Sequence, residues 1–166
     1  MDFYCKNMQI PECIKIIKTE NKGNTIISSR EIKKEEIIFK FVGKLLPQKE
    51  ANKKALQIDE DLFLESTELF DDNLNHSCNP NCYIDFKNLN LIAKRDIKKG
   101  EELSFDYHTS EYDLIEQGCS FECHCGSKNC IGKIKGFRFL NEEKKKEVLE
   151  FASPYIKKKY QEELNS

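Results

Sequence analysis

NHSCNPN stands at residues 75–81, GEELSFDY at residues 100–107 and CHCGSKNC at residues 123–130. Each stretch taken alone is compatible with a surface loop, a strand or a metal-binding knuckle. Together the three stretches bring amide, imidazole, phenol and thiol groups into one part of the chain, in a defined order. That order is the most informative feature of the sequence.

The composition is that of a soluble globular domain. The chain has 166 residues, enough for one domain with one core, and 34% of them are charged. The net charge of −2 argues against a nucleic-acid binder held by a global positive field. No apolar run approaches the roughly 20 residues of a membrane span, and the N-terminal MDFYCK has no basic region followed by an apolar stretch. We therefore expect an intracellular protein, in the nucleus or the cytoplasm, with no membrane partner and no direct nucleic-acid binding.

Short β-branched and aromatic runs between turn residues predict a mostly β fold with short helices. The expected strands are residues 25–29, 36–42, 58–64, 83–86, 89–93 and 102–107. The fourth and fifth of these form a hairpin that turns near Lys87 and Asn88. Two related turns, REIKKEE at residues 30–36 and RDIKKGE at residues 95–101, each precede an apolar strand. Either two strands share a turn type, or the copies are matching units that face each other across a site.

The last 25 residues or so are predicted to form a pair of helices. Asn141 is a suitable N-cap for the first helix. Pro154 interrupts the run, and Ser153 can cap a second helix that has Pro154 at its first position. One apolar face of this second helix carries Tyr155, Ile156 and Tyr160. The lysine runs at residues 144–146 and 157–159 predict solvated faces, with nuclear import or nucleic-acid binding as the minor alternative.

The cysteines near residue 125 predict a metal site. They follow the spacing Cys-x-Cys-x4-Cys at Cys123, Cys125 and Cys130. In an intracellular chain, clustered cysteines more often bind a metal than form disulfides. Three thiolates supply three of the four ligands that a tetrahedral zinc ion takes in a closed, structural site. The spacing leaves the fourth ligand open among Cys78, Cys82, Cys119 and His124.

The polar loop and the tyrosine each have an ordinary structural interpretation. Asn75 and His76 lie in a polar loop that apolar residues flank, so their side chains need hydrogen-bond partners. A bound polar cofactor can supply these partners, although a single histidine is more often structural. Tyr107 ends a predicted strand, where a tyrosine usually packs with its ring inside and its hydroxyl outside.

In their order and spacing, the three motifs resemble the signature of SET-domain protein-lysine methyltransferases that carry a zinc-binding post-SET tail. The resemblance covers about residues 19–132. It implies a SET-type fold of small curved sheets, with a C-terminal strand tucked through a loop as a pseudoknot. We therefore divide the chain into an N-terminal extension, a SET domain, a post-SET zinc segment and a helical C-terminal extension packed on the domain, at residues 1–18, 19–118, 119–135 and 136–166.

The resemblance also implies an enzyme that transfers methyl groups from S-adenosylmethionine to the ε-amine of lysine in a histone tail or another protein. It gives the catalytic role to Tyr107. It implies that Phe41, Phe105 and Tyr107 form the walls of the channel for the substrate lysine. The cofactor contacts map onto Lys22, Gly23, Asn24, Asn75, His76, Tyr107 and Phe121. For one structural zinc ion, it selects Cys78 beside Cys123, Cys125 and Cys130, with Cys119 as the fallback.

The chain departs from the family pattern at two positions. Thr25 stands where a Gly-x-Gly turn has its second glycine, and Phe41 stands where the family commonly has a tyrosine that helps to position the substrate amine. These departures support an alternative, a degenerate SET-like module that binds cofactor or peptide without turnover. Intact Asn75, His76 and Tyr107 favour the active enzyme. A zinc-stabilised nucleic-acid binder would need a basic stripe with interleaved aromatics, which the net charge disfavours.

The chemistry that the resemblance implies requires a neutral lysine. An unperturbed lysine has a pKa of about 10.4, so its neutral form costs roughly 4 kcal/mol at neutral pH. A narrow apolar channel lowers that pKa by desolvation. In the family, the residue two before the catalytic tyrosine controls how many methyl groups fit, and tyrosine there restricts the product to one. Phe105 at this position predicts di- or trimethylation.

Overall fold

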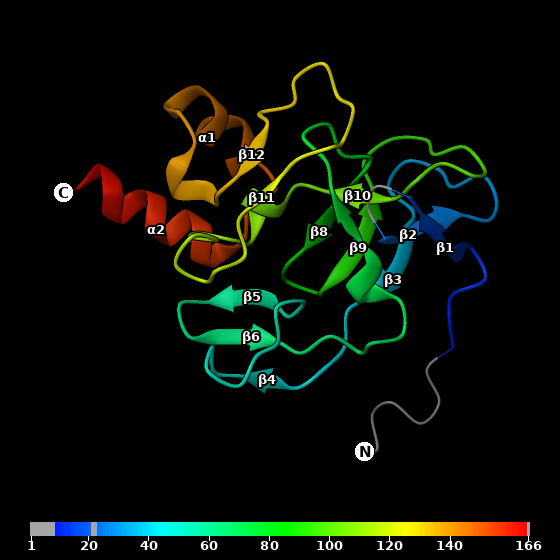
Figure 1. Cartoon of the computed structure of the whole chain (residues 1–166), viewed down its shortest axis with the longest axis horizontal. Helices are drawn as coiled ribbons and strands as arrows, with labels where there is room; N and C mark the ends of the chain where they lie inside the picture. Colours follow the sequence, from blue (N-terminus) through cyan, green and yellow to red (C-terminus); the bar gives the residue numbers. More distant parts are fainter. Residues whose placement is uncertain (1–8, 21–22, 166) are drawn as a thin grey trace.

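The computed structural model describes residues 9–20 and 23–165, which form many short strands and, near the C-terminal end, two α-helices (Figure 1). Within these residues the strands make five small sheets, none with more than three strands. The predicted class, mostly β with short helices, is confirmed. The strands are β1 (Ile14–Thr19), β2 (Gly23–Ser28), β3 (Ile37–Lys40), β4 (Leu45–Leu46), β5 (Leu56–Asp59), β6 (Leu62–Leu64), β7 (Asn75–His76), β8 (Cys82–Asp85), β9 (Asn90–Ala93), β10 (Ser104–Phe105), β11 (Phe121–Glu122) and β12 (Lys133–Ile134).

The predicted hairpin in the middle of the chain is confirmed as β8 and β9, to which β3 adds a third strand. Its turn is closed by Asp85, which accepts hydrogen bonds from the Lys87 backbone N–H at 3.0 Å and from the Asn88 side chain at 2.7 Å. Aspartate commonly fixes turns in this way. The inward residues of these strands, such as Leu91 and Ala93, are fully buried in the main core.

The prediction of one strand at residues 58–64 is wrong. Two antiparallel strands occupy this region, β5 and β6, and β4 pairs with the other edge of β6. Glu60 and Asp61 separate them, and the Asp59 carboxylate accepts a hydrogen bond from the Glu60 backbone N–H at 2.8 Å. Acidic residues are poor strand formers, and here they form the turn between two apolar runs.

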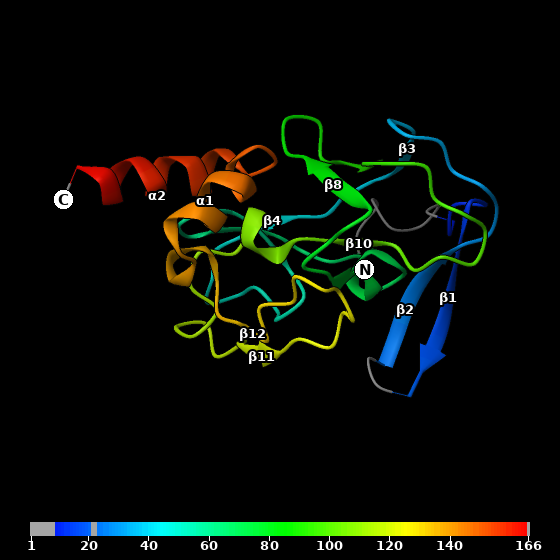
Figure 2. The same cartoon turned by 90° about the horizontal axis from the view of Figure 1, so that it is seen from above.

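The N-terminal hairpin was only half predicted. β2 was expected, but its partner β1 lies mostly in the segment interpreted as an N-terminal extension. The signal for β1 was its isoleucines, of which Ile14 is buried while Ile17 is exposed. The hairpin lies at one end of the molecule and the C-terminal helices lie at the other (Figures 1 and 2).

The two related turns meet each other directly in the core. Ile32 and Ile97 are fully buried and exchange two backbone hydrogen bonds of 2.9 and 2.8 Å. Each turn is closed in the same way, because the backbone N–H of the lysine at its fourth position donates to the glutamate at its seventh position, at 3.1 Å in both copies. The repeated sequence therefore builds two matching turns that pair with one another.

A short parallel pairing joins the two central motifs of the sequence. β7 pairs with β10, so that Asn75 lies beside Ser104 and His76 beside Phe105. The predicted pseudoknot brings the C-terminal strand beside the Asn-His loop, and the pairing of β10 with β7 is that contact. The predicted strand at residues 102–107 is shorter than expected, since Asp106 caps a 3₁₀ helix, η2 (Tyr107–Thr109), by accepting a hydrogen bond from the His108 backbone N–H at 3.1 Å. Tyr107 thus begins a helical turn and does not end a strand.

The two predicted helices are confirmed as α1 (Glu142–Leu149) and α2 (Pro154–Leu164). Asn141 and Ser153 cap them as expected, accepting hydrogen bonds from the backbone N–H groups of Lys144 at 2.8 Å and Ile156 at 3.2 Å. They pack through a small core that also receives the 3₁₀ helix η3 (Phe137–Phe139), formed by Phe137, Val148, Ala152, Tyr155, Ile156 and Tyr160. Neither of them, nor any other helix in the described part of the chain, is long and apolar enough to cross a membrane.

The lysine runs in these helices are solvated only in part. Lys145 is buried, and its ammonium pairs with Glu163 at 2.5 Å. Lys159 reaches across to Glu60, in the turn between β5 and β6, at 2.6 Å. Lys145 and Lys159 therefore form ion pairs that tie the helices to their neighbours. The runs of like charge gave no sign of these two ion pairs.

Candidate active site and metal site

A pocket of about 510 Å³ opens between β5, the end of β10 and the cysteine-rich segment. The three predicted channel residues, Phe41, Phe105 and Tyr107, all line it. Besides Tyr107, three further predicted cofactor residues line it: Asn75, His76 and Phe121. A third 3₁₀ helix, η1 (Asp71–Asn73), borders the pocket through its two aspartates. A volume of this size is typical of a small-molecule site.

Aromatic rings surround Tyr107 inside the pocket. The centroid of its ring lies 4.9 Å from that of Phe105 and 5.9 Å from that of Phe121. The Tyr107 hydroxyl donates a hydrogen bond to the Leu74 carbonyl at 2.8 Å. Burial, and secondarily the carboxylates of Glu111 and Glu102, raise the pKa of Tyr107 well above its usual value. Tyr107 therefore keeps its proton, and its hydroxyl oxygen can accept a hydrogen bond from a group in the pocket.

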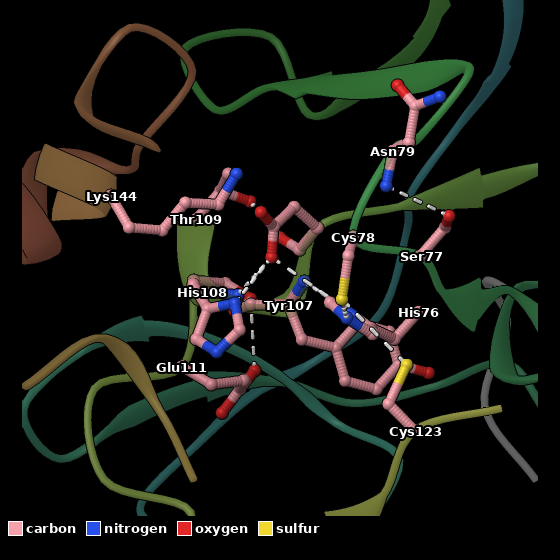
Figure 3. Close-up of polar contacts among 12 residues, drawn as sticks. His76, Ser77, Cys78, Asn79, Tyr107, His108, Thr109, Glu111, Cys123 and Lys144 are labelled. Atoms are coloured by element: carbon pink, nitrogen blue, oxygen red, sulfur yellow. Dashed lines mark hydrogen bonds and ion pairs between the residues drawn. The ribbon is translucent and has the colours of Figure 1, made fainter. Parts of the chain in front are cut away.

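His76 links Tyr107 to the cysteines (Figure 3). Its Nδ1 accepts a hydrogen bond from the Tyr107 backbone N–H at 3.2 Å, so a neutral ring carries its proton on Nε2. Nε2 lies 3.3 Å from the Cys78 sulfur. Asp106 approaches Nδ1 to 3.6 Å and lies 2.6 Å from Nδ1 of His108. The ring orientation of His76 is thus set from both sides.

Of the remaining predicted cofactor residues, Asn24 contacts Asn75. The Asn75 side chain donates to the Asn24 carbonyl at 3.4 Å and to Glu102 at 3.2 Å. Gly23 has a φ of 72°, a conformation that glycine adopts without strain. Gly23 and Asn24 do not line the large pocket itself. Lys22 lies outside the described residues.

Thr25, the first departure from the family pattern, points into the protein. Its side chain is 1% exposed, and its hydroxyl donates to Glu102 at 2.7 Å. The residue that replaces the second glycine of the family turn is therefore buried, and its hydroxyl has a hydrogen-bond partner inside the protein. Phe41, the second departure, is buried and packs edge-on against Phe39 with ring centroids 5.0 Å apart.

Four cysteine sulfurs come close enough together to be the ligands of one zinc ion. The metal-ligating atoms of this group lie within 4.8 Å of one another and belong to Cys78, Cys123, Cys125 and Cys130. The Cys78 and Cys123 sulfurs are 3.9 Å apart, close to the roughly 3.8 Å expected for two thiolates on one zinc ion with Zn–S bonds of about 2.3 Å. The structure thus brings together the set that the resemblance selected.

The alternative fourth ligands lie outside this group. Cys119 donates its thiol hydrogen to the Gln117 carbonyl at 3.4 Å. Cys82 is fully buried on β8, and its sulfur contacts the Asn81 side chain at 3.4 Å. Within the group, burial raises the pKa of the Cys78 thiol. At Cys125 burial acts in the same direction, but hydrogen bonds from the Cys78 and Ser127 backbone and from neighbouring thiols outweigh it and lower the pKa to about 6.

Glu111 is a buried residue of the pocket that the sequence analysis missed. It lines the pocket with 8% of its surface exposed. Its carboxylate accepts hydrogen bonds from the Ser110 hydroxyl at 3.1 Å and the Gln57 backbone N–H at 3.5 Å. Burial raises the pKa of Glu111 from 4.5 to about 7, although hydrogen bonds from Ser110, Gln57 and Gln117 lower it in part. Its spacing of four residues from Tyr107 was the only signal in the sequence.

Comparisons with known proteins agree with this geometry. A family model described as SET domain matches residues 23–108, slightly more than half of the chain. A histone-lysine N-methyltransferase, H3 lysine-36 specific, of Coccidioides immitis is 33% identical over 144 residues, which cover 74% of this chain and 14% of that protein. The protein of the same description in Schizosaccharomyces pombe is 29% identical, with 74% and 18% covered. The chain thus spans less than a fifth of the length of these two relatives.

Solved structures show the same fold. A crystal structure of KRYPTONITE in complex with mCHH DNA, H3(1-15) peptide and SAH superposes with a TM-score of 0.59 at 21% identity, covering 72% of this chain and 29% of the other. A second complex of KRYPTONITE, with mCHG DNA and SAH, gives a TM-score of 0.61 at 22% identity, with 72% and 28% covered. The chain therefore resembles these proteins in the arrangement of its strands as well as in its sequence motifs.

Proposed function

Because the chain belongs to the SET-domain family, we propose that it is a protein-lysine methyltransferase that uses S-adenosylmethionine. One observation carries the proposal: Phe41, Phe105 and Tyr107 line the same pocket as Asn75 and His76. An apolar wall with one hydroxyl therefore lies next to the polar pair that the family uses for its cofactor. That combination suits a reaction between an amine and a cofactor that enter one cavity.

The residues of the pocket also fit the cofactor. S-adenosylmethionine would supply an activated methyl group. Asn75 and His76 would bind its polar part, together with the backbone at Gly23 and Asn24. The Phe121 ring stands 6.2 Å from that of His76 and is half-buried at the pocket wall, where it can pack against a flat heterocycle. Phe121 belongs to β11, so the cysteine-rich segment forms one side of the site.

The apolar walls would make the substrate lysine reactive. The amine must lose a proton before it can act as a nucleophile, which costs roughly 4 kcal/mol for a free lysine at neutral pH. Phe41 and Phe105 are buried and exclude water, so they disfavour the charged form of a lysine between them. The Tyr107 oxygen can accept a hydrogen bond from the amine, since its own hydrogen is held by the Leu74 carbonyl. Much of the remaining acceleration would come from alignment.

The four clustered cysteines would hold one structural zinc ion. A tetrahedral site of four thiolates has no open position, so it stabilises the fold and takes no part in the chemistry. Cys78 comes from the Asn-His loop, and the other three ligands come from the segment that carries Phe121. Zinc would thereby hold that segment over the pocket.

A lysine in a protein, with the histone H3 tail as the first candidate, is the proposed substrate. Relatives of the chain are described as specific for H3 lysine-36, and one solved neighbour holds an H3(1-15) peptide. A histone substrate would place the protein inside the cell, and in the nucleus first.

The proposed function is tested by methyl transfer from labelled S-adenosylmethionine to histones and to total cell lysate, with products identified by mass spectrometry. Label on lysine is the expected result. Cofactor binding without transfer to any substrate would instead support the degenerate module, which Thr25 and Phe41 suggest from the sequence alone.

Phe105 makes a prediction about the product. With phenylalanine at this position, the enzyme is expected to make di- and trimethyl-lysine. Phe105→Tyr adds a hydroxyl that needs a hydrogen-bond partner in a buried channel, and the yield of higher products should fall about tenfold, the effect of one hydrogen bond of roughly 1.4 kcal/mol. Mass spectrometry of a reaction run to completion measures this. Phe139→Tyr, at an exposed ring on η3, serves as the control. A wild type that stops at monomethyl-lysine would contradict the prediction.

A further inference from the structure

We propose that Glu111 is the group that takes the proton from the substrate lysine. This inference rests on the proposed function, and it concerns a residue outside the family motifs quoted above. In the proposed step, the lysine ammonium gives one N–H proton to the Glu111 carboxylate, directly or through one water. The amine that remains keeps its electron pair for the new N–CH₃ bond, and the electron pair of the S–CH₃ bond that breaks stays on sulfur.

The position of Glu111 is fixed relative to Tyr107. The Glu111 backbone N–H donates to the Tyr107 carbonyl at 2.8 Å, so Glu111 closes the turn that begins at Tyr107. Both residues line the same pocket, and Figure 3 draws Glu111 on the turn that carries Tyr107 and His108. After burial, the Glu111 carboxylate is the next cause that raises the pKa of Tyr107, so the two groups interact across the pocket. The proposed step places the substrate amine between the Tyr107 hydroxyl and this carboxylate, or joins them through one water.

Glu111 has hydrogen-bond donors but no cation. Ser110 and Gln57 donate to its carboxylate, and no ion pair to it is formed by any residue that the structure describes. A buried carboxylate without a cation is costly. The ammonium of an incoming lysine supplies the missing positive charge, and a proton transfer then neutralises both groups.

Two pairs among the charged neighbours of Glu111 are engaged with each other. β5 contacts Glu111 through Gln57, and η3 contacts it through the Phe137 backbone N–H. The titratable side chains on these segments and around Tyr107 are Asp106, Tyr107 and His108 on the same turn, Glu102, Asp59 on β5, Asp113 and Glu116 on the following loop, and Arg138 on η3. Arg138 pairs with Asp113 at 2.8 Å, and Asp106 pairs with His108. With a pKa raised by burial to about 7, Glu111 is ionised in part at neutral pH and is a better proton acceptor than an ordinary carboxylate.

Replacing Glu111 by glutamine should reveal the role in the pH dependence of the reaction. Glu111→Gln keeps the shape and can still accept from Ser110 and Gln57, but it cannot take a proton. We expect kcat at neutral pH to fall about 10²-fold, the usual contribution of a general base. The deficit should shrink about tenfold per pH unit above neutrality, because the neutral fraction of lysine rises tenfold per unit. KM for the peptide and Kd for the cofactor should stay within about threefold.

Two further variants separate proton transfer from structure. Glu111→Asp keeps a carboxylate, so its kcat should lie between the kcat of wild type and that of Glu111→Gln. Its pH profile should be parallel to that of wild type. Asp72→Asn makes the same carboxylate-to-amide change in the same pocket, at a residue whose carboxylate is paired with Lys54 at 2.6 Å. Its profile should also be parallel to that of wild type. A Glu111→Gln deficit that is constant with pH, or a kcat within about threefold of wild type, would overturn the proposal.

A readout without turnover tests the same carboxyl. The folded pKa of about 7 lies above the ordinary 4.5, so the folded state holds the proton more tightly. The free energy of unfolding of wild type, measured relative to Glu111→Gln in the zinc-loaded protein, should therefore fall as the pH rises from 4.5 to about 7. A difference that does not change with pH would show that Glu111 titrates normally and would overturn the proposal. Should the wild type methylate nothing while this titration is seen, the proposed function and the proton transfer both fail, and only the raised pKa stands.

Discussion

Tyr107→Phe is expected to lower methyl transfer at least about a hundredfold, the usual effect of losing one hydrogen-bonding group at a reacting centre. The hydroxyl donates its hydrogen to the Leu74 carbonyl, which leaves its lone pairs directed to the pocket. The variant loses that fixed acceptor, so the amine is held less well in line with the methyl group. The phenylalanine ring still packs against Phe105 and Phe121, so the fold and the cofactor affinity should change little.

The control for this variant is Tyr83→Phe. Tyr83 lies on β8 outside the pocket, and its hydroxyl donates to Glu35 at 2.9 Å. Initial rates with labelled cofactor, together with calorimetric cofactor binding, measure both variants. Tyr83→Phe should keep its rate within about twofold, since exposed hydrogen bonds contribute little. Activity of Tyr107→Phe near that of the control would remove the catalytic role from Tyr107. Loss of cofactor binding together with the rate would give the hydroxyl a structural role.

The local signals in the sequence predicted the local structures. Asn141, Ser153 and Pro154 mark helix starts by chemistry that acts over three or four residues, and the helices begin where they indicate. Lys87 and Asn88 mark a turn in the same way, and the structure shows that Asp85 closes it. These predictions needed no knowledge of the rest of the chain.

Predictions that depended on distant contacts were less complete. Residues 58–64 were predicted as one strand, although Glu60 and Asp61 form a turn there, and the pairing of Glu60 with Lys159, almost one hundred residues later, has no signal in the sequence. Tyr107 was placed at a strand end because the capping role of Asp106 is not visible in an alternating pattern. A long-range pairing, β7 with β10, brings the Asn-His loop to Tyr107, and only the family resemblance indicated that contact.

Glu111 shows most clearly what a sequence pattern leaves out. An acidic residue in a polar stretch is usually solvated. Its buried carboxylate accepts a hydrogen bond from the backbone N–H of Gln57, on β5, more than fifty residues earlier in the chain. The candidate site is therefore predictable where its residues carry motifs, and it is not predictable where a residue acquires its properties from packing.

Removing one zinc ligand is the second large effect that we expect. Cys78→Ser should weaken zinc binding at least about a hundredfold, because even changes beside a ligand cost roughly 10–100-fold. The three remaining thiolates and β11 would then be held only by local contacts, and Phe121 would no longer be fixed at the pocket. The loss should extend to His76, whose Nε2 lies 3.3 Å from the Cys78 sulfur. Methyl transfer and thermal stability should therefore fall together with the metal.

Cys119→Ser is the matched control for this variant. Cys119 is in the same segment and lines the pocket, but its thiol donates to the Gln117 carbonyl and lies outside the four-sulfur group. Zinc content by elemental analysis, zinc release to a chromophoric chelator and melting temperature measure both variants. The control should hold one zinc ion and release it as slowly as wild type. The reverse result, zinc lost from Cys119→Ser and kept by Cys78→Ser, would give the fourth ligand position to Cys119. In that case the Asn-His loop would be free of the metal, and chelation would leave His76 and the cofactor affinity unchanged.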